Sequence, residues 1–434
     1  MQRHLVVWLD DSIIGKLSEE NDIWSFSYDD LWLQSQSRFE ISPHIPFVNS
    51  PVIDGSTYRP TQWFFDNLLP EEGAREVLSK EIKINVTDSF GLLEYYGAES
   101  AGALTLTSEG QVFSYDEHDH PLTNDVLSVR IRNLPSLSLT HEAPKKMSLA
   151  GAQNKLAVSF DVDTQNLFEP SRSGISTHIL KPDHSDHVTY YNSTVNEWFI
   201  MRLAKLVGLN VPDVYLKFVP EPVFLIDRFD RVKSSANNSV SRLHTIDGCQ
   251  LLNLSRTNKY FDATVENLSR LISHCRSKAL ARSSIFNWAL FNLLIGNDDA
   301  HLKNLSFFVQ SESIELTPFY DLLCTSIYQG KNPLGAEMAY AFGDVKRFEN
   351  VRREHVLNFA EDIGVAKKSA VSYINKLVAD IEPGFDALYQ EFEAMVLPEG
   401  YGPYKAGALR MLREIKYNIM NEMIRNITEE NTQY

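Results

Sequence analysis

The chain changes character near residue 230. Before that point, short apolar runs of strand length alternate with turns rich in Asp, Ser and Asn, whereas long stretches with helical spacing dominate after it. A strand-rich half followed by a helical half predicts an α+β fold built of two lobes. The 434 residues are enough for two to four packed units, so a further subdivision is expected.

The first 110 residues predict a β-rich unit. Residues 5–9, 13–17 and 23–28 alternate apolar and polar side chains and are separated by turn residues, as the strands of hairpins are. Residues 63–70, Trp-Phe-Phe-Asp-Asn-Leu-Leu-Pro, are strongly apolar and end at a proline. We expect them to form a short buried helix that anchors this unit.

The rest of the chain contains several plain elements. Each strand candidate is a short run of apolar residues, and each helix candidate spaces its apolar residues for one buried face. We predict strands at 156–160, 178–181 and 223–226, and helices at 196–208, 282–295 and 406–426.

Composition limits the function classes. The 41 Lys and Arg against 57 Asp and Glu give a net charge of −16, which argues against stand-alone binding to duplex DNA. No apolar run reaches the roughly 18 to 20 residues of a membrane span, and the N-terminus lacks the features of a signal peptide. We therefore expect no membrane association. Three widely spaced cysteines suit reduced thiols, so we expect a cytoplasmic protein.

Residues 296–304, Gly-Asn-Asp-Asp-Ala-His-Leu-Lys-Asn, carry the strongest chemical signal. They follow a predicted helix and so lie on a loop held by a rigid element. Residues 305–317 then predict a β-hairpin, whose partner strands lie about 5 Å apart. Pairing would return the chain beside Asn304 just before Asp321. We therefore expect Asp299, Asn304 and Asp321 to lie close together.

Phosphoryl transfer from ATP requires this set of groups. One carboxylate must accept the proton of the attacking hydroxyl, while an amide oxygen and a second carboxylate hold Mg²⁺ on the phosphates. Asp299 followed by Asn304 also has the Asp-x-x-x-x-Asn spacing of a protein-kinase catalytic loop. Two alternatives stay open: a polar loop whose Asp and Asn cap helices, and a metal phosphohydrolase with ligands Asp298, Asp299 and His301. We favour the kinase interpretation because such a hydrolase needs further His and Asp clusters.

Residues 148–155, Ser-Leu-Ala-Gly-Ala-Gln-Asn-Lys, precede the predicted strand at 156–160 and are rich in small side chains. Small residues let the backbone approach a phosphate, whose oxygens successive amides can bind. The segment is neither a Walker loop nor a full Gly-x-Gly-x-x-Gly. An ordinary hairpin turn is therefore at least as good an interpretation.

Lys181 ends the apolar strand at 178–181, and Glu197 opens the next predicted helix. A lysine at the end of a buried strand can bind α- and β-phosphates, and a helix glutamate can hold its ammonium, as in protein kinases. Taken singly, a surface lysine and a carboxylate favoured by the helix dipole explain the two residues better. Their order, lysine strand and then glutamate helix, favours the kinase interpretation.

Residues 223–231, Val-Phe-Leu-Ile-Asp-Arg-Phe-Asp-Arg, form an apolar strand that runs into a short charged linker. A kinase hinge, which offers backbone hydrogen bonds to adenine, would lie at such a place between the lobes, and Phe229 could stack on the base. The alternative is that the charged residues form surface ion pairs of small energetic value.

These motifs, taken in order along nearly the whole chain, resemble the HipA kinases. The likeness is carried by residues 148–155, 178–181, 196–197, 203–212, 227–231, 247–250, 296–304 and 316–321. It is also carried by two N-terminal segments, Phe-Phe-Asp-Asn-Leu-Leu-Pro at 64–70 and Gly-Ala-Glu-Ser-Ala-Gly-Ala-Leu at 97–104.

The resemblance implies a two-lobed, protein-kinase-like fold with an extra N-terminal subdomain. The implied domains are an N-terminal β-rich subdomain at 1–110, an ATP-binding N-lobe at 111–229 and a helical catalytic C-lobe at 230–434.

The resemblance also implies a role for each site residue, with ATP and Mg²⁺ as cofactors. Asp299 would be the general base, and Asn304 and Asp321 would hold Mg²⁺. Lys181 would bind the ATP phosphates, with Glu197 in support. The remaining nucleotide contacts would come from Ala150, Gly151, Ala152, Gln153, Asn154, Lys155, Asp227, Arg228, Phe229, His301 and Tyr320.

Ser148 matches the autophosphorylation serine of the family. A phosphate there would add about two negative charges beside a phosphate-binding loop, which should repel ATP and eject the loop. We therefore predict that the form phosphorylated at Ser148 is inactive. Ala300 and Asp298 stand where other members often carry glycine or another small polar residue, and Asp227 where a longer acid can occur. These departures leave the required functional groups in place but bear on substrate choice and nucleotide affinity.

HipA kinases are the toxin halves of toxin–antitoxin pairs, and their antitoxin, HipB, is a small helix-turn-helix dimer that binds operator DNA. The resemblance therefore implies a HipB-like partner and contact with operator DNA mainly through it. The family's targets lie in translation, with aminoacyl-tRNA synthetases as the leading type, and the resulting growth arrest gives persister cells. An alternative is a co-repressor scaffold with little kinase activity, and a lipid or small-molecule kinase is a more distant one.

Overall fold

The structure is a computed structural model that describes residues 2–110, 119–147, 149–171, 174–234, 240–311 and 313–429. The chain forms two compact units, each assembled from separate stretches of sequence. The first unit consists of Met1–Ser185, Val219–Thr257 and Ser306–Thr317, and the second of Asp186–Phe218, Asn258–Leu305 and Pro318–Tyr434. Both units contain strands and helices, so the predicted α+β class is confirmed.

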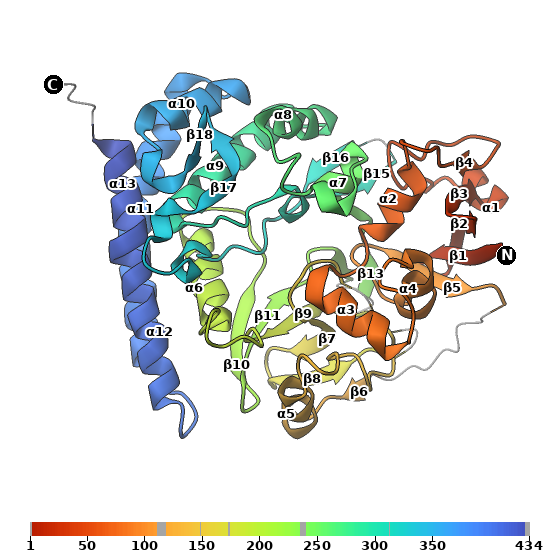
Figure 1. Cartoon of the computed structure of the whole chain (residues 1–434), viewed down its shortest axis with the longest axis horizontal. Helices are drawn as coiled ribbons and strands as arrows, with labels where there is room; N and C mark the ends of the chain where they lie inside the picture. The colour runs from red at the N-terminus through yellow and green to blue at the C-terminus, as the bar shows by residue number, and fades with distance from the viewer. Residues whose placement is uncertain are drawn as a thin grey trace. The chain divides into compact units, whose positions relative to one another are not determined.

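The N-terminal part of the first unit is an antiparallel sheet of five strands (Figure 1). The strands are β1 (Arg3–Leu9), β2 (Ser12–Glu20), β3 (Ile23–Tyr28), β4 (Val52–Ile53) and β5 (Leu104–Ser108), in the order β4-β3-β2-β1-β5. Leu5 and Val7 of β1 and Phe26 of β3 are buried, because alternate side chains of a strand point to the same face. The three strands predicted from the sequence are confirmed.

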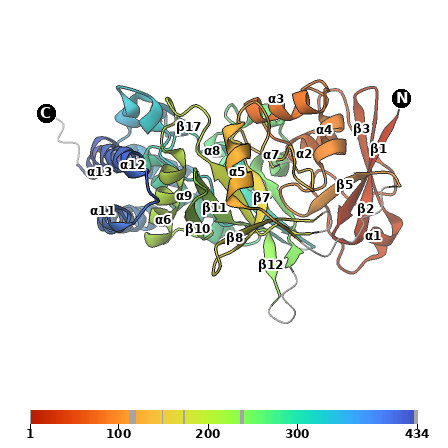
Figure 2. The same cartoon turned by 90° about the horizontal axis from the view of Figure 1, so that it is seen from below.

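Four short helices accompany this sheet. They are α1 (Asp30–Gln34), α2 (Pro60–Asp66), α3 (Glu72–Glu81) and α4 (Ser89–Tyr96). Helices α2 and α4 lie against the same side of the sheet (Figure 1, Figure 2). The predicted anchoring helix is α2, which carries Pro60 in its first turn and buries Phe64 and Phe65. Helices α3 and α4 were not predicted. Helix α4 is apolar on most sides and lacks clear helical spacing.

The first unit contains a second sheet, which carries the predicted strands of the ATP-binding region. Its strands are β6 (His120–Pro121), β7 (Leu156–Asp161), β8 (Asn166–Glu169), β9 (His178–Pro182) and β11 (Pro222–Asp227), and helix α5 (Asn124–Arg132) follows β6. The order of neighbours is β11-β9-β7-β8-β6. Lys181 of β9 lies opposite Phe224 of β11, and both are buried. The strands predicted at 156–160, 178–181 and 223–226 are confirmed.

The region after residue 230 contains strands as well as helices, so the prediction of a mostly helical second half is incomplete. The first unit takes from it β12 (Arg231–Lys233), β13 (Val240–Arg242), β14 (Thr245–Asp247), α7 (Gly248–Leu252), β15 (Ser306–Gln310) and β16 (Ser313–Leu316). Strands β15 and β16 are the predicted hairpin, with Leu316 opposite Phe307. The Thr317 backbone nitrogen donates to the Ser306 oxygen at 3.0 Å, so the hairpin returns the chain to its start.

The second unit is mostly helical. Its elements are α6 (Ser193–Leu206), β10 (Val214–Phe218), α8 (Val265–His274), α9 (Lys278–Ile295), β17 (Glu337–Phe342), β18 (Val345–Arg347), α10 (Arg353–Asp362), α11 (Lys367–Ala394), α12 (Gly402–Glu414) and α13 (Asn421–Thr428). Figure 1 shows α12 and α13 as one continuous rod, which contains a π-helical segment, Ile415–Met420. The helices predicted at 196–208, 282–295 and 406–426 are confirmed, although the π-helical segment divides the last one. No helix in the described part of the chain is long and apolar enough to cross a membrane.

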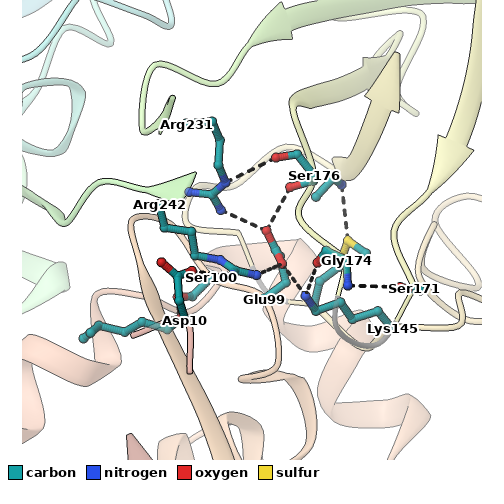
Figure 3. Close-up of polar contacts among 12 residues, drawn as sticks. Asp10, Glu99, Ser100, Lys145, Ser171, Gly174, Ser176, Arg231 and Arg242 are labelled. Carbon is teal, nitrogen blue, oxygen red and sulfur yellow. Dashed lines mark hydrogen bonds and ion pairs between the residues drawn. The ribbon is translucent and has the colours of Figure 1, made fainter. Parts of the chain in front are cut away.

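A buried carboxylate, that of Glu99, organises the polar interior of the first unit (Figure 3). It accepts hydrogen bonds from four side chains: Lys145 at 2.6 Å, Arg228 at 3.0 Å, Arg231 at 2.9 Å and Ser176 at 2.8 Å. Burial alone would raise the pKa of Glu99, but the neighbouring cations hold it well below its ordinary value. Glu99 is therefore ionised in the folded protein.

The same network corrects one expectation about the linker at 227–231. The Arg228 guanidinium also donates to Asp230 at 2.7 and 3.0 Å, and only 1% of its side chain is exposed. Asp230 in turn accepts a hydrogen bond from the Gly102 backbone nitrogen at 2.9 Å. Arg231 is buried in the same network. The alternative of surface ion pairs is wrong, because these charges lie inside the first unit.

Removing the Glu99 charge should destabilise the protein strongly. A Glu99→Gln variant leaves several buried cations without their counter-charge, which costs about 3–5 kcal/mol of unfolding free energy. Urea unfolding measures the loss. Glu109→Gln is the control, since Glu109 pairs with Lys16 at 3.1 Å on the surface and such pairs are worth about 0–1 kcal/mol. Equal losses in the two variants would contradict the role given to Glu99.

A buried histidine, His244, makes the stability of the first unit depend on pH. Its Nε2 atom donates to the Ile41 oxygen at 2.8 Å, and its ring stacks on Phe39 with 5.2 Å between centroids. Burial lowers the pKa of His244 to about 4, although the hydrogen bond to Ile41 opposes this. An unfolded chain takes up a proton on histidine near pH 6.5. His244 therefore stays neutral in the folded protein at pH values where the unfolded chain is protonated.

The unfolding free energy should therefore fall as the pH falls from about 6.5 towards 4, by up to about 3 kcal/mol from His244. We expect His244→Gln, which keeps an N–H donor, to lose this part of the slope. Urea unfolding at a series of pH values measures the slope. The control is Leu280→Gln, which places the same side chain at an exposed position without a titratable group and should keep the wild-type slope. The same slope in wild type and His244→Gln would rule out this contribution.

Candidate active site

Helix α9 ends at Gly296 and supports the loop 297–304. Gly296 has a φ of +70°, a left-handed backbone conformation that residues with a Cβ atom disfavour. A Cβ atom there would lie 2.3 Å from the Ser326 Oγ atom, so space also requires glycine. Most of α9 is buried, and its packing therefore fixes the point from which the loop starts.

Asn297 fixes the backbone of this loop. Its side-chain nitrogen donates to Asn292 Oδ1 at 2.7 Å, and its Oδ1 accepts from the Asp299 backbone nitrogen at 3.1 Å. The same oxygen accepts from the Thr325 hydroxyl at 3.2 Å, and this hydroxyl accepts from the Asp298 backbone nitrogen at 2.7 Å. One buried amide thus determines the position of the Asp299 backbone.

The Asp299 carboxylate is contacted by Tyr260. The Tyr260 hydroxyl donates a hydrogen bond to Asp299 Oδ1, and His301 Nε2 lies 4.0 Å from the same oxygen. The rings of Tyr260 and His301 meet edge to face at 4.9 Å. The Asp299 side chain is 46% exposed, so a reacting hydroxyl could reach it from solvent.

The surroundings of Asp299 make it more basic. The surrounding protein raises the pKa of Asp299 to about 6 by burial, even though one edge of the side chain is exposed. The Tyr260 hydrogen bond and the Lys259 charge oppose this rise, whereas the Asp321 and Asp298 carboxylates add to it. A carboxylate of this kind is ionised at pH 7 and accepts a proton more readily than an ordinary aspartate. Both properties are those of a general base.

Asn304 contacts Asp299, and Asp321 is near enough to act on it electrostatically, as predicted from the hairpin. The Asn304 side-chain nitrogen donates to the Asp299 backbone oxygen at 2.8 Å, which leaves the amide oxygen as the atom for a cation. Asp321 acts electrostatically on Asp299. Its φ of +54° is left-handed, an uncommon conformation for a residue other than glycine and one that collects at functional sites.

The oxygen donors of Asn304 and Asp321 suit magnesium, which prefers hard oxygen ligands. In the described ranges, no group of three or more His, Cys, Asp or Glu side chains could hold a metal ion by itself. The phosphohydrolase alternative, with ligands Asp298, Asp299 and His301, therefore lacks support. A kinase magnesium site fits better, since it takes most of its ligands from phosphates and water.

His301 and Tyr320, two of the predicted nucleotide contacts, belong to the same site. His301 is buried against Tyr260. The Tyr320 hydroxyl donates to the Lys303 backbone oxygen at 2.7 Å and so ties the segment after the hairpin to the loop. This hydroxyl is engaged with protein, which leaves the Tyr320 ring as the part that could touch a nucleotide.

The predicted phosphate-covering loop, residues 150–155, lies in the first unit. Gly151 has a φ of +109°, and its oxygen accepts from the Glu71 backbone nitrogen at 3.1 Å. The Lys155 ammonium donates to the Ala150 oxygen at 2.7 Å. The loop is thus closed on itself and is also bonded to the segment that follows α2.

The rest of this loop is linked to strand β9. The Gln153 side chain donates to the Pro182 oxygen at 3.2 Å, one residue beyond Lys181. Ala152 and Asn154 complete the loop, whereas Ser148 lies outside the described residues.

Lys181 and Glu197 are both buried. The Lys181 ammonium lies 5.7 Å from the centroid of the Phe224 ring, so it is not the surface lysine of the alternative interpretation. Glu197 lies in the second turn of α6, which begins at Ser193. A helix-start carboxylate favoured by the dipole is therefore also the wrong explanation for Glu197, since the dipole acts within the first turn.

The predicted adenine segment begins at the end of β11. Asp227 lies opposite His178 of β9, with 2.8 Å between Asp227 Oδ1 and His178 Nε2. The Phe229 ring meets the Phe308 ring edge to face at 6.1 Å. The Arg228 guanidinium is enclosed in the Glu99 network, and the nucleotide contact of Arg228 stays a prediction.

Three site residues were not predicted from the sequence: Tyr260, Lys259 and Asn297. Tyr260 and Lys259 lie about 40 residues before Asp299 and belong to none of the motifs quoted above. Asn297 lies inside the 296–304 motif, and its place directly after the helix-ending Gly296 is the signal that could have found it.

The amino-acid sequence matches two protein families. The HipA N-terminal domain matches residues 5–107, and the HipA-like C-terminal domain matches residues 147–385, more than half of the chain. The serine/threonine-protein kinase toxin HipA of Shewanella oneidensis is 28% identical over 87% of this chain and 87% of that protein. The putative kinase Y4mE of Sinorhizobium fredii is 31% identical over 87% of this chain and 89% of that protein.

The fold is similar as well. A chain in the solved complex of HipA, HipB and operator DNA from Shewanella oneidensis MR-1 superposes with a TM-score of 0.78 at 26% identity. The match covers 98% of this chain and 100% of the other. The resemblance stated from the motifs and the HipA-like fold that it implied are confirmed. The chain therefore belongs to the HipA family of serine/threonine protein kinases.

Proposed function

We propose that this chain is the toxin of a toxin–antitoxin pair and uses Mg-ATP to phosphorylate serine or threonine in a component of translation. The observation that carries the proposal is the group formed by Asp299, Asn304 and Asp321. A basic carboxylate beside two oxygen ligands is what phosphoryl transfer needs. Membership of the HipA family supports the same activity.

In this proposal Asp299 is the general base. It accepts the proton of the substrate hydroxyl while the hydroxyl oxygen attacks the γ-phosphorus and ADP leaves. Asn304 and Asp321 would hold Mg²⁺ through their side-chain oxygens, and the bound ion would neutralise charge on the phosphates. The partial exposure of the Asp299 side chain would let the substrate hydroxyl approach it.

The nucleotide contacts are proposed from the predicted segments. Lys181 would pair with the ATP phosphates, and Glu197 remains its predicted supporting carboxylate. Residues 150–155 would cover the phosphates through backbone amides, for which the left-handed conformation of Gly151 is suited. The adenine would be bound by Asp227 and Phe229, and further contacts would come from His301 and the Tyr320 ring.

The partner is proposed to be a HipB-like helix-turn-helix antitoxin dimer. The Shewanella oneidensis complex contains HipA, HipB and operator DNA, which supports such an assembly for this chain. The net charge of −16 disfavours contact with a phosphate backbone, so the antitoxin would provide most of the operator contact. The substrate would be of the aminoacyl-tRNA synthetase type. Its phosphorylation in the cytoplasm would arrest growth and promote persistence.

Loss of the base should abolish both catalysis and growth arrest. We expect Asp299→Ala to lower the rate of phosphoryl transfer by about 10²- to 10⁴-fold, because the substrate proton loses its acceptor. Growth after induced expression and quantitative phosphoproteomics of the same cells measure the effect. The matched control is Asp344→Ala, which removes an exposed carboxylate beside β18 and should leave arrest intact. Arrest that persists with Asp299→Ala would favour the co-repressor scaffold over the kinase.

Phosphorylation of Ser148 should weaken ATP binding. About two added negative charges next to the proposed phosphate-covering loop repel the ATP phosphates. Calorimetric titration of Mg-ATP into the phosphorylated and unphosphorylated proteins, separated by charge and identified by mass, measures the difference. Ser148→Ala should bind ATP as the unphosphorylated protein does. Equal affinity of the two separated forms would refute the inactive-form prediction.

A further inference from the structure

Tyr260 reaches the proposed catalytic carboxylate from a loop that none of the quoted motifs contains. Its hydroxyl donates a hydrogen bond to Asp299 Oδ1 across 39 residues of sequence. A phenol hydroxyl and a substrate serine hydroxyl are donors of the same kind. Tyr260 therefore occupies one acceptor position of the carboxylate that must receive the substrate proton.

The ring and the backbone of Tyr260 are both held in place. The Lys259 ammonium lies 5.0 Å from the ring centroid, and the His301 ring packs edge to face against it at 4.9 Å. Lys259 is buried, and its backbone oxygen accepts from the Leu302 nitrogen at 3.4 Å, within the catalytic loop. The Tyr260 backbone oxygen accepts a hydrogen bond from the Ala263 backbone nitrogen at 3.1 Å. These contacts fix the position of the Tyr260 hydroxyl relative to Asp299.

We propose that Tyr260 is a positioning residue for the catalytic base, which fixes Asp299 Oδ1 and so turns Oδ2 towards the substrate hydroxyl. The proposal rests on the proposed role of Asp299 as general base. In the transfer step, the substrate O–H bond breaks as its oxygen bonds to the γ-phosphorus, and the proton passes to Asp299 Oδ2. The bond from the γ-phosphorus to the bridging oxygen breaks, and ADP leaves with that electron pair. Tyr260 keeps its own proton throughout.

The physical reason lies in the freedom of a carboxylate. The last torsion of an aspartate side chain is broad and roughly two-fold, so an unanchored carboxylate has no single direction. A hydrogen bond to the ionised form is charge-assisted and strong enough to select one direction. This selection acts on proton transfer, and it leaves the binding of ATP unchanged.

The Tyr260→Phe variant tests the proposal, because it removes one oxygen atom and keeps the ring that packs on His301. We expect kcat to fall about 10- to 100-fold, the effect of losing one charge-assisted hydrogen bond from the reacting group. The KM values for ATP and for the acceptor should stay within about twofold of wild type. The assay is phosphate transfer from radiolabelled Mg-ATP to myelin basic protein as a general acceptor, with the full chain.

Tyr417→Phe is the matched control. Tyr417 is 57% exposed and Tyr260 44%. The Lys416 ammonium lies 5.4 Å from the Tyr417 ring centroid, and the Lys259 ammonium lies 5.0 Å from that of Tyr260. The control therefore removes the same atom from a similar environment on the π-helical segment. It should leave kcat and both KM values unchanged.

Several results would overturn the proposal. One is a Tyr260→Phe kcat within twofold of wild type, and another is a rise in KM that accounts for the whole loss of kcat/KM, which would make Tyr260 a binding residue. ADP affinity and thermal unfolding are measured in parallel. If the Tyr260→Phe protein has both a lower ADP affinity and a lower unfolding temperature than wild type, Tyr260 acts through packing alone.

The Asp299→Ala variant in the same assay separates this proposal from the one on which it rests. Full activity of Asp299→Ala would contradict the general-base role itself. An inactive Asp299→Ala protein beside an unimpaired Tyr260→Phe protein would contradict only the positioning role of Tyr260.

Discussion

The first unit depends on one buried carboxylate, that of Glu99. Its partners come from stretches of chain that are far apart in sequence, including Lys145, the linker at 227–231 and Arg242. A buried charge of this kind adds little net stability compared with an apolar core, but removing one partner leaves the others uncompensated. The network therefore specifies which segments meet, and a chain in which one of them was displaced would carry unpaired charge in its interior.

The position of this network matters for the proposed nucleotide site. Lys145 lies three residues before Ser148, and Arg228 directly follows Asp227, the start of the predicted adenine segment. The proposed phosphate-covering loop is held a second time by the Gly151 oxygen, which accepts from the Glu71 nitrogen. The N-terminal β-rich subdomain, which contributes Glu99 and Glu71, is thus bonded to both proposed nucleotide segments of the first unit.

The parts of the site that could be predicted from the sequence are those whose geometry is local. Asp299, Asn304 and Asp321 are separated only by a helix end and a hairpin, and hairpin pairing is readable from alternating side chains. The Glu99 network could not be predicted in this way. The sequence of a charged linker does not distinguish residues that face water from residues that pair in the interior. Only the tertiary fold decides whether they are buried. Tyr260 was missed for a related reason, because its partner is distant in sequence and its own segment has no periodic pattern. Helix α4 is apolar on most sides, so it also lacked a periodic signal.

The division of the chain between the two units has a consequence for its synthesis. The first unit is completed by the β15–β16 hairpin, which ends near Thr317, about three quarters of the way along the 434 residues. While the ribosome is still translating the preceding region, strand β14 has no β15 to pair with, although the N-terminal sheet can already close. The catalytic group is assembled later still, since Asp321 follows the hairpin. A nascent chain or a prematurely terminated product that ends before Asp321 would therefore lack part of the proposed phosphotransfer group, so this kinase would become competent only after about three quarters of the chain had been made.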